Sequence, residues 1–574
     1  GFRFATGFGK TLSRLVRHGI GVHHAGMLPG YRRLVEQLAQ QGLLKVVCGT
    51  DTLGVGINVP IRTVLMTGLA KFDGTRMRHL QAREFHQIAG RAGRAGYDTS
   101  GTVVVMAPEH DIENARRVKK AGDDPKKLKR VERKKPAEGT VSWGEQTYER
   151  LLHADPEPLQ SRFKVTTGML INLAQRPGNA FDAARHLLLG NDEPRARQRQ
   201  HVRRAIALFR SLEAAEVVER FGPPGARDVR LTIDLPRDFA LDQPLSPFAL
   251  AALDLLDQES PTYALDLLSV LESTLDDPRQ VLMAQVHKAK GEAVAEMKAE
   301  GIEYDERMEL LEDVTYPKPL EDLLLPAYET FRQTQPWVGD HELRPKSVAR
   351  DLSERYMTFT EYVSYYSLAR SEGLVLRYLA DAYKALRRVV PDAARTEEVR
   401  DLQEWLGELV RQTDSSLLDE WEALSNPTAE VRPPDLAAPP PAVTRNLRAF
   451  RTLVRNALFR RVELVALRRW IDLAELDGSF SQDAWEEGIR GYFAEHDVLG
   501  TGPDARGPGF LRIEQQPTRW VVRQVFDDPE GDHDWGITAV VDLAESDARG
   551  EAALQVVSIG RTDGSWLDDV PEPE

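Results

Sequence analysis

Three polar side chains within HQIAGRAGRAG, residues 86–96, have the types and spacing needed to bind a phosphate group. Gln87, Arg91 and Arg94 are separated by four and three residues, most of them Gly or Ala. At that spacing an amide and two guanidinium groups lie on one face of a helical turn. A guanidinium is a planar, permanently charged donor that suits the oxygens of a transferring phosphoryl group. A solvated basic turn would be the better interpretation of an isolated Arg-x-x-Arg pair, but the flanking pattern favours the arginine-finger element of a nucleotide triphosphatase.

A second candidate segment lies upstream, where the apolar run LLKVVC, residues 43–48, predicts a buried strand. It leads into GTDTLGVGINVP, residues 49–60, and α/β folds place ligand contacts in the loops that follow parallel strands. A hydroxyl there suits a phosphate, an acid and an amide suit a ribose, and glycines let the backbone approach closely. An ordinary strand-to-helix loop is the alternative, but two such loops in one chain favour a binding site. The candidate residues are Thr50, Asp51, Gly54, Gly56 and Asn58.

Both segments resemble motifs in the second RecA-like domain of superfamily 2 DExH-box helicases of the Ski-like (superkiller, antiviral) type. TDTLGVGINVP is similar to motif V, QIAGRAGRAG is similar to motif VI, and GVHHAGMLPGYR at residues 21–32 is similar to the segment before motif V. The resemblance implies an ATP-dependent nucleic-acid helicase that uses Mg²⁺. It also implies that most of the nucleotide is held by a first RecA-like domain upstream.

The resemblance assigns the candidate residues to three groups. The catalytic group, which would contact the nucleotide phosphates across the inter-domain cleft, is Gln87, Arg91 and Arg94. The nucleotide-binding group is Asp51, Gly54, Gly56 and Asn58, and the nucleic-acid-binding group includes Thr50, His24 and Gly26. For the pair His23 and His24 we expect packed or backbone-bonded imidazoles and no metal, because no third ligand stands at metal-like spacing.

Two elements that a helicase motor needs are missing from the sequence. ATP binding requires a Gly-x-x-x-x-Gly-Lys-Thr loop and an acidic DExH box for Mg²⁺. The nearest match is Gly9-Lys10-Thr11, but the position of the first glycine is occupied by Phe4. We therefore expect the chain to lack ATP hydrolysis on its own and to be preceded by the missing first domain.

Composition restricts the remaining possibilities. The 574 residues include 41% apolar residues and carry a net charge of −14, which argues against a globally basic nucleic-acid binder. The single Cys48 is expected to be a buried core thiol, and one cysteine suits a reducing cytoplasm. No apolar run approaches a membrane span. Residues 116–135 hold eleven Lys or Arg against three acidic residues, which fits either a solvated helix or linker, or an arm that contacts phosphates.

The next segment predicts helices followed by a strand-turn-strand element. Residues 161–173 and 181–189 have apolar residues at helical spacing, and a basic helix is expected at residues 195–210. Residues 217–221 and 229–235 then alternate like two strands, an order typical of a winged helix and similar to that domain in Ski-like helicases. Arg199 and Arg203 would face nucleic acid or solvent, and the sequence does not choose between them.

Residues 246–424 have an almost wholly helical period, with one amphipathic helix at residues 367–390. Core packing explains most of that helix. Its Glu372-Gly373 pair, Arg377 and Leu386-Arg387 nevertheless resemble the long ratchet helix of the family, which crosses the bottom of the strand channel. We therefore place Arg377 and Tyr378 near the channel, where a guanidinium and an aromatic ring can stack on unpaired bases.

A Pro-rich segment at residues 426–445 predicts an extended linker. Helices up to about residue 496 and four alternating strands follow, so we expect a small α+β domain. The acidic turn DDPEGDHDW, residues 527–535, is not expected to bind metal, because no second ligand group is apparent elsewhere. This part resembles the appended domain of unknown function in actinobacterial Ski-like helicases, and a protein partner is one possible role for it.

The predicted fold is therefore multidomain. The predicted parts are an α/β RecA-like domain (1–115), a basic linker (116–140), a winged-helix-like domain (141–245), a mainly α helical bundle (246–425), a Pro-rich linker (426–445) and an α+β domain (446–574). The leading functional hypothesis is the C-terminal part of a cytoplasmic ATP-dependent helicase, with RNA favoured over DNA on resemblance. A catalytically silent nucleic-acid-binding or scaffold protein is the alternative.

Overall fold

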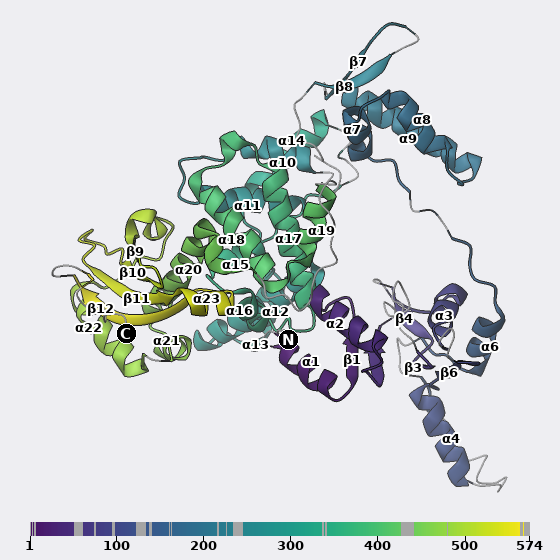
Figure 1. Ribbon diagram of the computed structural model, residues 1–574, viewed down its shortest axis with the longest axis horizontal. Coiled ribbons are helices and arrows are strands. Elements are labelled where there is room, and N and C mark those ends of the chain that lie inside the picture. Colours follow the sequence, from purple (N-terminus) through teal and green to yellow (C-terminus); the bar gives the residue numbers. More distant parts are fainter. Residues whose placement is uncertain are drawn as a thin grey trace. The chain divides into compact units, whose positions relative to one another are not determined.

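The chain forms two compact units in the computed structural model, residues 8–162 and residues 163–574 together with residues 1–7 (Figure 1). The structure describes residues 2, 4, 7–50, 61–73, 76–93, 98–121, 134–136, 141–159, 161, 163–214, 217–224, 227–232, 245–335, 338, 341–425, 441–478, 480–562 and 566–567. No helix among these residues has the length and apolar character needed to cross a membrane.

Parallel strand pairs joined by helices build the first unit. Strands β1 (Ile20–His23) and β2 (Val46–Gly49) pair in parallel, with Ile20 opposite Val46, and the connection runs through α2 (Pro29–Gln40). The parallel pair β3 (Thr63–Met66) and β6 (Thr102–Val105) is connected through the hairpin β4 (Ala70–Phe72) and β5 (Met77–His79) and helix α3 (Ala82–Ala89). These crossovers confirm the α/β character predicted for this part of the chain. The unit also contains α1 (Phe8–Arg17), α4 (Glu109–Ala121) and α6 (Glu145–His153).

The predicted burial of β2 is wrong. Cys48 is exposed in the structure, and so is Val46 of the same strand. Both strands are edges of this sheet of two described strands, but helices α1 and α2 pack mainly on β1. A strand with an uncovered face and edge cannot bury its apolar side chains, so Cys48 is no core thiol here.

Helix α6 belongs to the first unit, which differs from the predicted domain boundary at residue 140. Its Leu151 joins a core with Met66, Leu69, Leu80 and Phe85. Trp143, just before α6, donates its indole N–H to the carbonyl of Met106 at 3.1 Å. Apolar burial and this hydrogen bond hold the segment against the α/β elements, which explains why it does not start a new domain.

The second unit begins with the helices and hairpin that the sequence predicts. Helices α7 (Thr167–Gln175), α8 (Ala180–Leu189) and α9 (Arg195–Ala214) are followed by the antiparallel strands β7 (Val218–Phe221) and β8 (Asp228–Leu231). Thr166 and Asn179 cap α7 and α8 by accepting hydrogen bonds from backbone N–H groups. The predicted continuation of the second strand to residue 235 lies partly outside the described residues.

The predicted helical bundle is confirmed, and α17 lies at its centre. Most side chains of α17 are buried, including Leu376, Leu379 and Leu386, and α17 packs against α11 and α18. The helices are α10 (Ser246–Leu253), α11 (Tyr263–Thr274), α12 (Arg279–Ala299), α13 (Tyr304–Leu310), α14 (Glu321–Thr334), α15 (Ala349–Glu354), α16 (Phe359–Tyr365), α17 (Glu372–Val389), α18 (Glu397–Asp414) and α19 (Ser416–Ser425).

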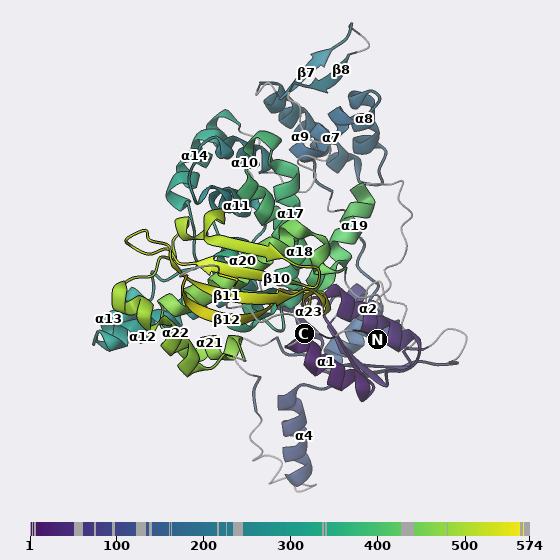
Figure 2. The ribbon, with the colours of Figure 1, turned by 60° about the vertical axis from the view of Figure 1, so that its left-hand side comes forward.

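The C-terminal part of this unit contains the predicted antiparallel sheet. Its strands lie in the order β12-β11-β10-β9, and the sheet packs against α20 and α22 (Figure 2). One apolar core joins these elements to Tyr356 of the helical bundle, so the predicted α+β domain shares its core with the bundle. The elements are α20 (Leu447–Ala466), α21 (Trp470–Leu476), α22 (Gln482–Glu495), β9 (Leu511–Gln515), β10 (Arg519–Val525), β11 (Trp535–Asp542), α23 (Leu543–Arg549) and β12 (Ala553–Arg561).

The predicted Pro-rich linker is only partly described, because residues 426–440 lie outside the described residues. Its last five residues, 441–445, are anchored to the rest of the second unit at Pro441 and Val443. Val443 is fully buried, and the side chain of Gln412 donates to the carbonyl of Pro441 at 2.7 Å. The end of the linker therefore differs from the extended segment predicted by its proline content.

Candidate nucleotide and nucleic-acid site

A hydrogen-bonded carboxylate organises the start of α3, the helix that carries Gln87. Glu84 accepts from the backbone N–H of Gln81 at 2.8 Å, which completes a capping box. Arg78 binds both oxygens of Glu84 at 2.8 Å, and Lys71 pairs with the same carboxylate at 2.8 Å. The hydrogen bonds from Arg78 are the main reason why the pKa of Glu84 falls to about 2. The helix is thereby fixed to the β4–β5 hairpin that precedes it.

A second carboxylate, which the sequence did not indicate, holds the same helix end. Glu157 accepts from the backbone N–H groups of Ala82 and Arg83 at 2.8 and 2.9 Å. The hydrogen bond from Arg83 is the main cause of the lowered pKa of Glu157. His86, one turn later, bonds the carbonyl of Ala154 at 3.1 Å. Glu157 lies some 75 positions from its partners and matches no local motif, so no sequence signal marks it.

The turn after α3 fixes the backbone at Arg91. The helix ends at Ala89, and Arg91 continues it by a single N–H bond to the carbonyl of Ile88 at 3.2 Å. Gly93 then donates to the carbonyl of Ile61 at 2.8 Å and adopts a φ of +94°, a conformation that favours glycine. The structure therefore places Arg91 in a tethered turn, which corrects the prediction that it shares a helical face with Gln87.

The structure describes two of the three predicted catalytic residues. Gln87 is exposed on α3, and Arg91 is half-buried in the turn that follows. Arg94 lies outside the described residues, as do Asp51, Gly54, Gly56 and Asn58 of the predicted nucleotide-binding group.

Residues of the predicted nucleic-acid-binding group meet at the carboxyl ends of β1 and β2. His23 and Gly49 are opposite each other at the ends of these parallel strands, and Thr50 donates its backbone N–H to the carbonyl of His23 at 3.2 Å. His24 accepts from the backbone N–H of Gly26 at 3.2 Å through Nδ1. This edge, where parallel strands end, is where α/β folds bind ligands.

The two adjacent histidines have different surroundings, and both fit the predicted packed or backbone-bonded pair. His23 is buried, and its Nε2 bonds the carboxylate of Glu36 at 2.9 Å. Burial is the main cause that lowers the pKa of His24, and the nearby charges of His23 and Arg32 add to it. A neutral imidazole at His24 agrees with its role as an acceptor from Gly26.

In the second unit, α17 presents one predicted residue to solvent and buries the other. Arg377 is exposed, whereas Tyr378 is 5% exposed and donates its hydroxyl to Glu272 at 3.0 Å. The buried ring is not available to stack on a base, which corrects the predicted channel position of Tyr378. Because helix residues one position apart face different directions, only one of the pair can reach the surface.

Glu272 is a structural residue that the sequence did not reveal. It is fully buried in α11 and accepts the backbone N–H groups of Val348, Ala349 and Arg350 at 2.8, 2.9 and 3.1 Å. These are N–H groups at the start of α15, so Glu272 caps that helix while it binds the hydroxyl of Tyr378. Burial raises the pKa of Glu272. The carboxylate therefore joins α11, α15 and α17.

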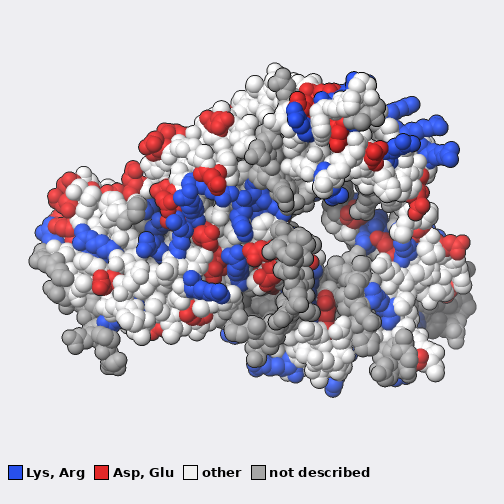
Figure 3. Space-filling view, turned by 45° about the horizontal axis from the view of Figure 1, so that its top comes forward, with Lys and Arg blue, Asp and Glu red and all other residues white. Residues whose placement is uncertain are grey.

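Basic side chains occur on two helices of this unit, and Figure 3 shows Lys and Arg gathered in patches on one face of the molecule. On α17, Arg377, Lys384 and Arg388 recur at the spacing of one helix side, and Lys384 lies 3.5 Å from Asp381. On α9, Arg199 and Arg203 are both exposed. Their exposure fits a solvated face and a nucleic-acid contact equally.

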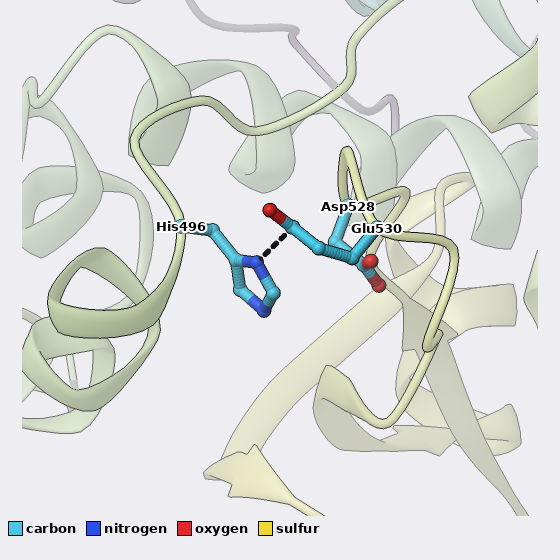
Figure 4. Close-up of side chains that lie close together, drawn as sticks. All are labelled: His496, Asp528 and Glu530. Carbon is cyan, nitrogen blue, oxygen red and sulfur yellow. Dashed lines mark hydrogen bonds and ion pairs between the residues drawn. The ribbon is translucent and has the colours of Figure 1, made fainter.

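The acidic turn near the C-terminus meets a histidine, which corrects the expectation that no second ligand group stands nearby. Figure 4 shows His496, after α22, with its Nδ1 bonded to Glu530, while Asp528 lies beside them. Asp528 accepts the backbone N–H groups of Asp532 and His533 at 2.9 and 2.7 Å. Burial works against ionisation of Asp528, but these backbone donors outweigh it and lower its pKa. The carboxylate of Asp528 thus stabilises its own turn. The expectation that the acidic turn, residues 527–535, binds no metal stays a prediction.

Comparisons with known proteins match both parts of the chain. The family model described as a helicase conserved C-terminal domain matches residues 5–96, and the model of a domain of unknown function (DUF3516) matches residues 107–559. A DExH-box ATP-dependent RNA helicase of Arabidopsis thaliana is 49% identical over 109 residues, 19% of this chain and 8% of that protein. The antiviral helicase SKI2 of Saccharomyces cerevisiae is 37% identical over 164 residues, 29% of this chain and 10% of that protein. The ATP-dependent RNA helicase mtr4 of Schizosaccharomyces pombe is 46% identical over 95 residues, 17% of this chain and 8% of that protein. The chain thus spans about a tenth of the length of these relatives.

Proposed function

We propose a function from the premise that this chain belongs to the family of the domain of unknown function DUF3516 and carries a helicase conserved C-terminal domain similar to that of Ski-like DExH-box helicases. The proposal is that the chain is the C-terminal part of an ATP-dependent helicase that acts on nucleic acid, with RNA favoured over DNA. The preference for RNA follows the relatives, two of which are named RNA helicases. A cytoplasmic location is part of the same proposal.

The tethered turn at Arg91 is the observation that carries this proposal. A guanidinium stabilises a transferring phosphoryl group only when its position is fixed before the reaction. Glu84 and Glu157 fix the start of α3, and the hydrogen bond from Gly93 to Ile61 fixes the turn that follows this helix. Arg91 and Arg94 would then contact the γ-phosphate, and Gln87 would donate from the adjacent helix.

The donors described in this segment fit phosphate oxygens and do not fit Mg²⁺, which takes oxygen ligands. Mg²⁺ and most of ATP would be held by another domain with the phosphate-binding loop and the DExH box. When bound there, ATP supplies the phosphoryl group and the free energy of its hydrolysis. On this side, Asp51, Gly54, Gly56 and Asn58 would line the nucleotide, and the chain alone would not hydrolyse ATP.

For nucleic acid we propose two contact regions. His24, Gly26 and Thr50 would contact the sugar-phosphate backbone of the nucleic acid, and their position beside the carboxyl ends of β1 and β2 supports this proposal. Arg377 would contact the nucleic-acid strand from the exposed side of α17. Tyr378 would hold that helix in place through its hydrogen bond to Glu272. We also propose a winged-helix-like domain within the predicted range 141–245; helices α7 to α9 and the hairpin that follows them, in residues 163–232, support it.

ATP hydrolysis by this chain joined to a domain with the phosphate-binding loop and DExH box tests the proposal. RNA should stimulate turnover, and Arg91→Ala should lower it by roughly 10³-fold or more. Arg76→Ala, which removes an exposed arginine from the β4–β5 turn of the same unit, is the matched control and should leave turnover unchanged. Normal turnover of the Arg91 variant would exclude the finger role, and RNA binding without any hydrolysis would favour a scaffold.

A further inference from the structure

The turn between α12 and α13 has a fixed shape but no part in the proposed motor, and it lies at the edge of the helical bundle (Figure 2). Gly301 adopts a φ of +79°, and Ile302 donates its N–H back to the carbonyl of Met297 at 3.0 Å. This arrangement is typical of a helix C-terminus closed by glycine. Met297 and Leu311 are buried, so the turn is anchored on both sides.

Residues 292–313, which we name the acidic segment, carry an unusual share of the charge of the protein. They hold nine carboxylates against Lys298 and Arg307, a net charge of −7, which is half of the −14 of the whole chain. All nine carboxylate residues are exposed. They are Glu292, Glu296, Glu300, Glu303, Asp305, Glu306, Glu309, Glu312 and Asp313. Such a field repels phosphates, so this surface does not suit nucleic acid.

The acidic segment also exposes large apolar side chains. Tyr304 is 64% exposed, Met308 is 43% exposed and Leu310 is 46% exposed, and α13 has no buried residue. Tyr304 and Met308 are four residues apart, so they are neighbours on one face of α13. A solvated acidic helix needs no such side chains, and contiguous exposed apolar groups bordered by charge are typical of protein interaction sites. Tyr and Met are also enriched in the cores of protein interfaces.

We propose that the acidic segment is a docking site for a cationic amphipathic helix of a partner protein. The Lys and Arg residues of such a helix complement the net charge of −7, and its apolar face covers Tyr304 and Met308. Charge complementarity accelerates the encounter and fixes the orientation, while burial of the apolar anchors supplies most of the affinity. This inference is independent of the proposed helicase activity, because it uses no residue of the nucleotide or nucleic-acid sites.

Binding of a fluorescein-labelled helical peptide of Lys and Leu, about 18 residues long with Leu at the spacing of one helix face, tests this docking site. Fluorescence anisotropy with the full chain should show saturable binding that weakens as salt rises. Tyr304→Ser combined with Met308→Ser should lower the affinity about tenfold or more, as expected for the loss of interface anchors. Glu303→Gln combined with Glu306→Gln should lower the affinity and reduce its salt dependence.

The control replaces two other exposed apolar residues of the same unit. Leu467→Ser combined with Ile471→Ser, at positions 64% and 65% exposed near the α20–α21 turn, should leave the affinity unchanged. All of these side chains are at the surface, and circular dichroism verifies that each variant is folded. Unchanged binding by the Tyr304 and Met308 variant, an equal loss in the control, or equal binding of a Glu and Leu peptide would each overturn the proposal.

Discussion

Substitution of Gly101 by Ala should loosen the turn that holds Arg91. Gly101 begins the approach to β6, and a Cβ atom added there would lie 2.3 Å from both the carbonyl carbon and the oxygen of Ala92 and 2.6 Å from the nitrogen of Gly93. These are backbone atoms, which cannot rotate away as a side chain can. The two segments must separate by about 1 Å to reach ordinary van der Waals contact. Overpacking of this kind typically costs about 1–3 kcal/mol.

Amide hydrogen exchange measures this loss of free energy at the turn itself. The N–H groups of Gly93 and Thr102, which bond the carbonyls of Ile61 and Arg62, should exchange about 5- to 150-fold faster in Gly101→Ala, as a loss of 1–3 kcal/mol requires. A displacement of about 1 Å at a catalytic group can cost about 10²-fold in rate, so turnover of the protein joined to its ATP-binding domain should also fall.

Gly291→Ala is the matched control for this prediction. Gly291 lies inside α12, and a Cβ atom there meets no other atom within 4 Å. The substitution should stabilise the chain by about 0.5–1 kcal/mol, because alanine favours the helix. Unchanged exchange at Gly93 and Thr102 together with unchanged turnover in Gly101→Ala would refute the argument that close backbone packing fixes Arg91.

Two further predictions concern the buried carboxylates around α17. Glu372 is buried, its Oε1 has no hydrogen-bond partner, and burial raises its pKa to about 8. Because the unfolded carboxyl ionises near its ordinary pKa of 4.5, the folded state loses stability as pH rises from 4.5 to 8. Glu372→Gln should therefore match the wild type at pH 4.5 and exceed it at pH 8 by on the order of a few kcal/mol in denaturant unfolding, and a constant difference would contradict the pKa shift. Tyr378→Phe leaves Glu272 with three backbone donors and should cost about 1–2 kcal/mol. A double-mutant cycle that combines Tyr378→Phe with Glu272→Gln should show a non-additive effect on the free energy of unfolding. Additive effects would exclude an energetic coupling between these two side chains.

The order of elements could be predicted from the sequence because local periodicity determines it. The basic run at residues 195–210 became α9, the alternating runs after residue 511 became an antiparallel sheet, and the helical stripe around Leu376 became α17. Burial was less predictable, since it depends on what covers an element. Cys48 has the apolar neighbours of a core strand, yet β2 lies at the edge of its described sheet and exposes it.

Several residues that organise the structure were missed because their partners are distant in sequence. Glu157 acts on α3 from about 75 positions away, Glu272 acts on Tyr378 from 106 positions away, and His496 meets Glu530 across 34 positions. None of these side chains belongs to a motif with fixed local spacing. Local motifs in the sequence therefore predict candidate ligand contacts, and the three-dimensional structure was needed to find the residues that hold the surrounding elements in place.

The distribution of charge connects the two proposed surfaces. A net charge of −14 argues against nucleic-acid binding only if the charge is spread evenly, and half of it lies in residues 292–313. The remaining 552 residues carry −7, and they include the basic sides of α9 and α17. At physiological salt the field of exposed charges decays within about 8 Å. On these proposals the acidic segment would attract a cationic partner while the basic side of α17 would attract phosphates, provided that the two surfaces are separated by more than this distance. An assay in which saturating RNA leaves the affinity of the Lys and Leu peptide unchanged would demonstrate that separation, whereas competition between the two would show that they share one surface.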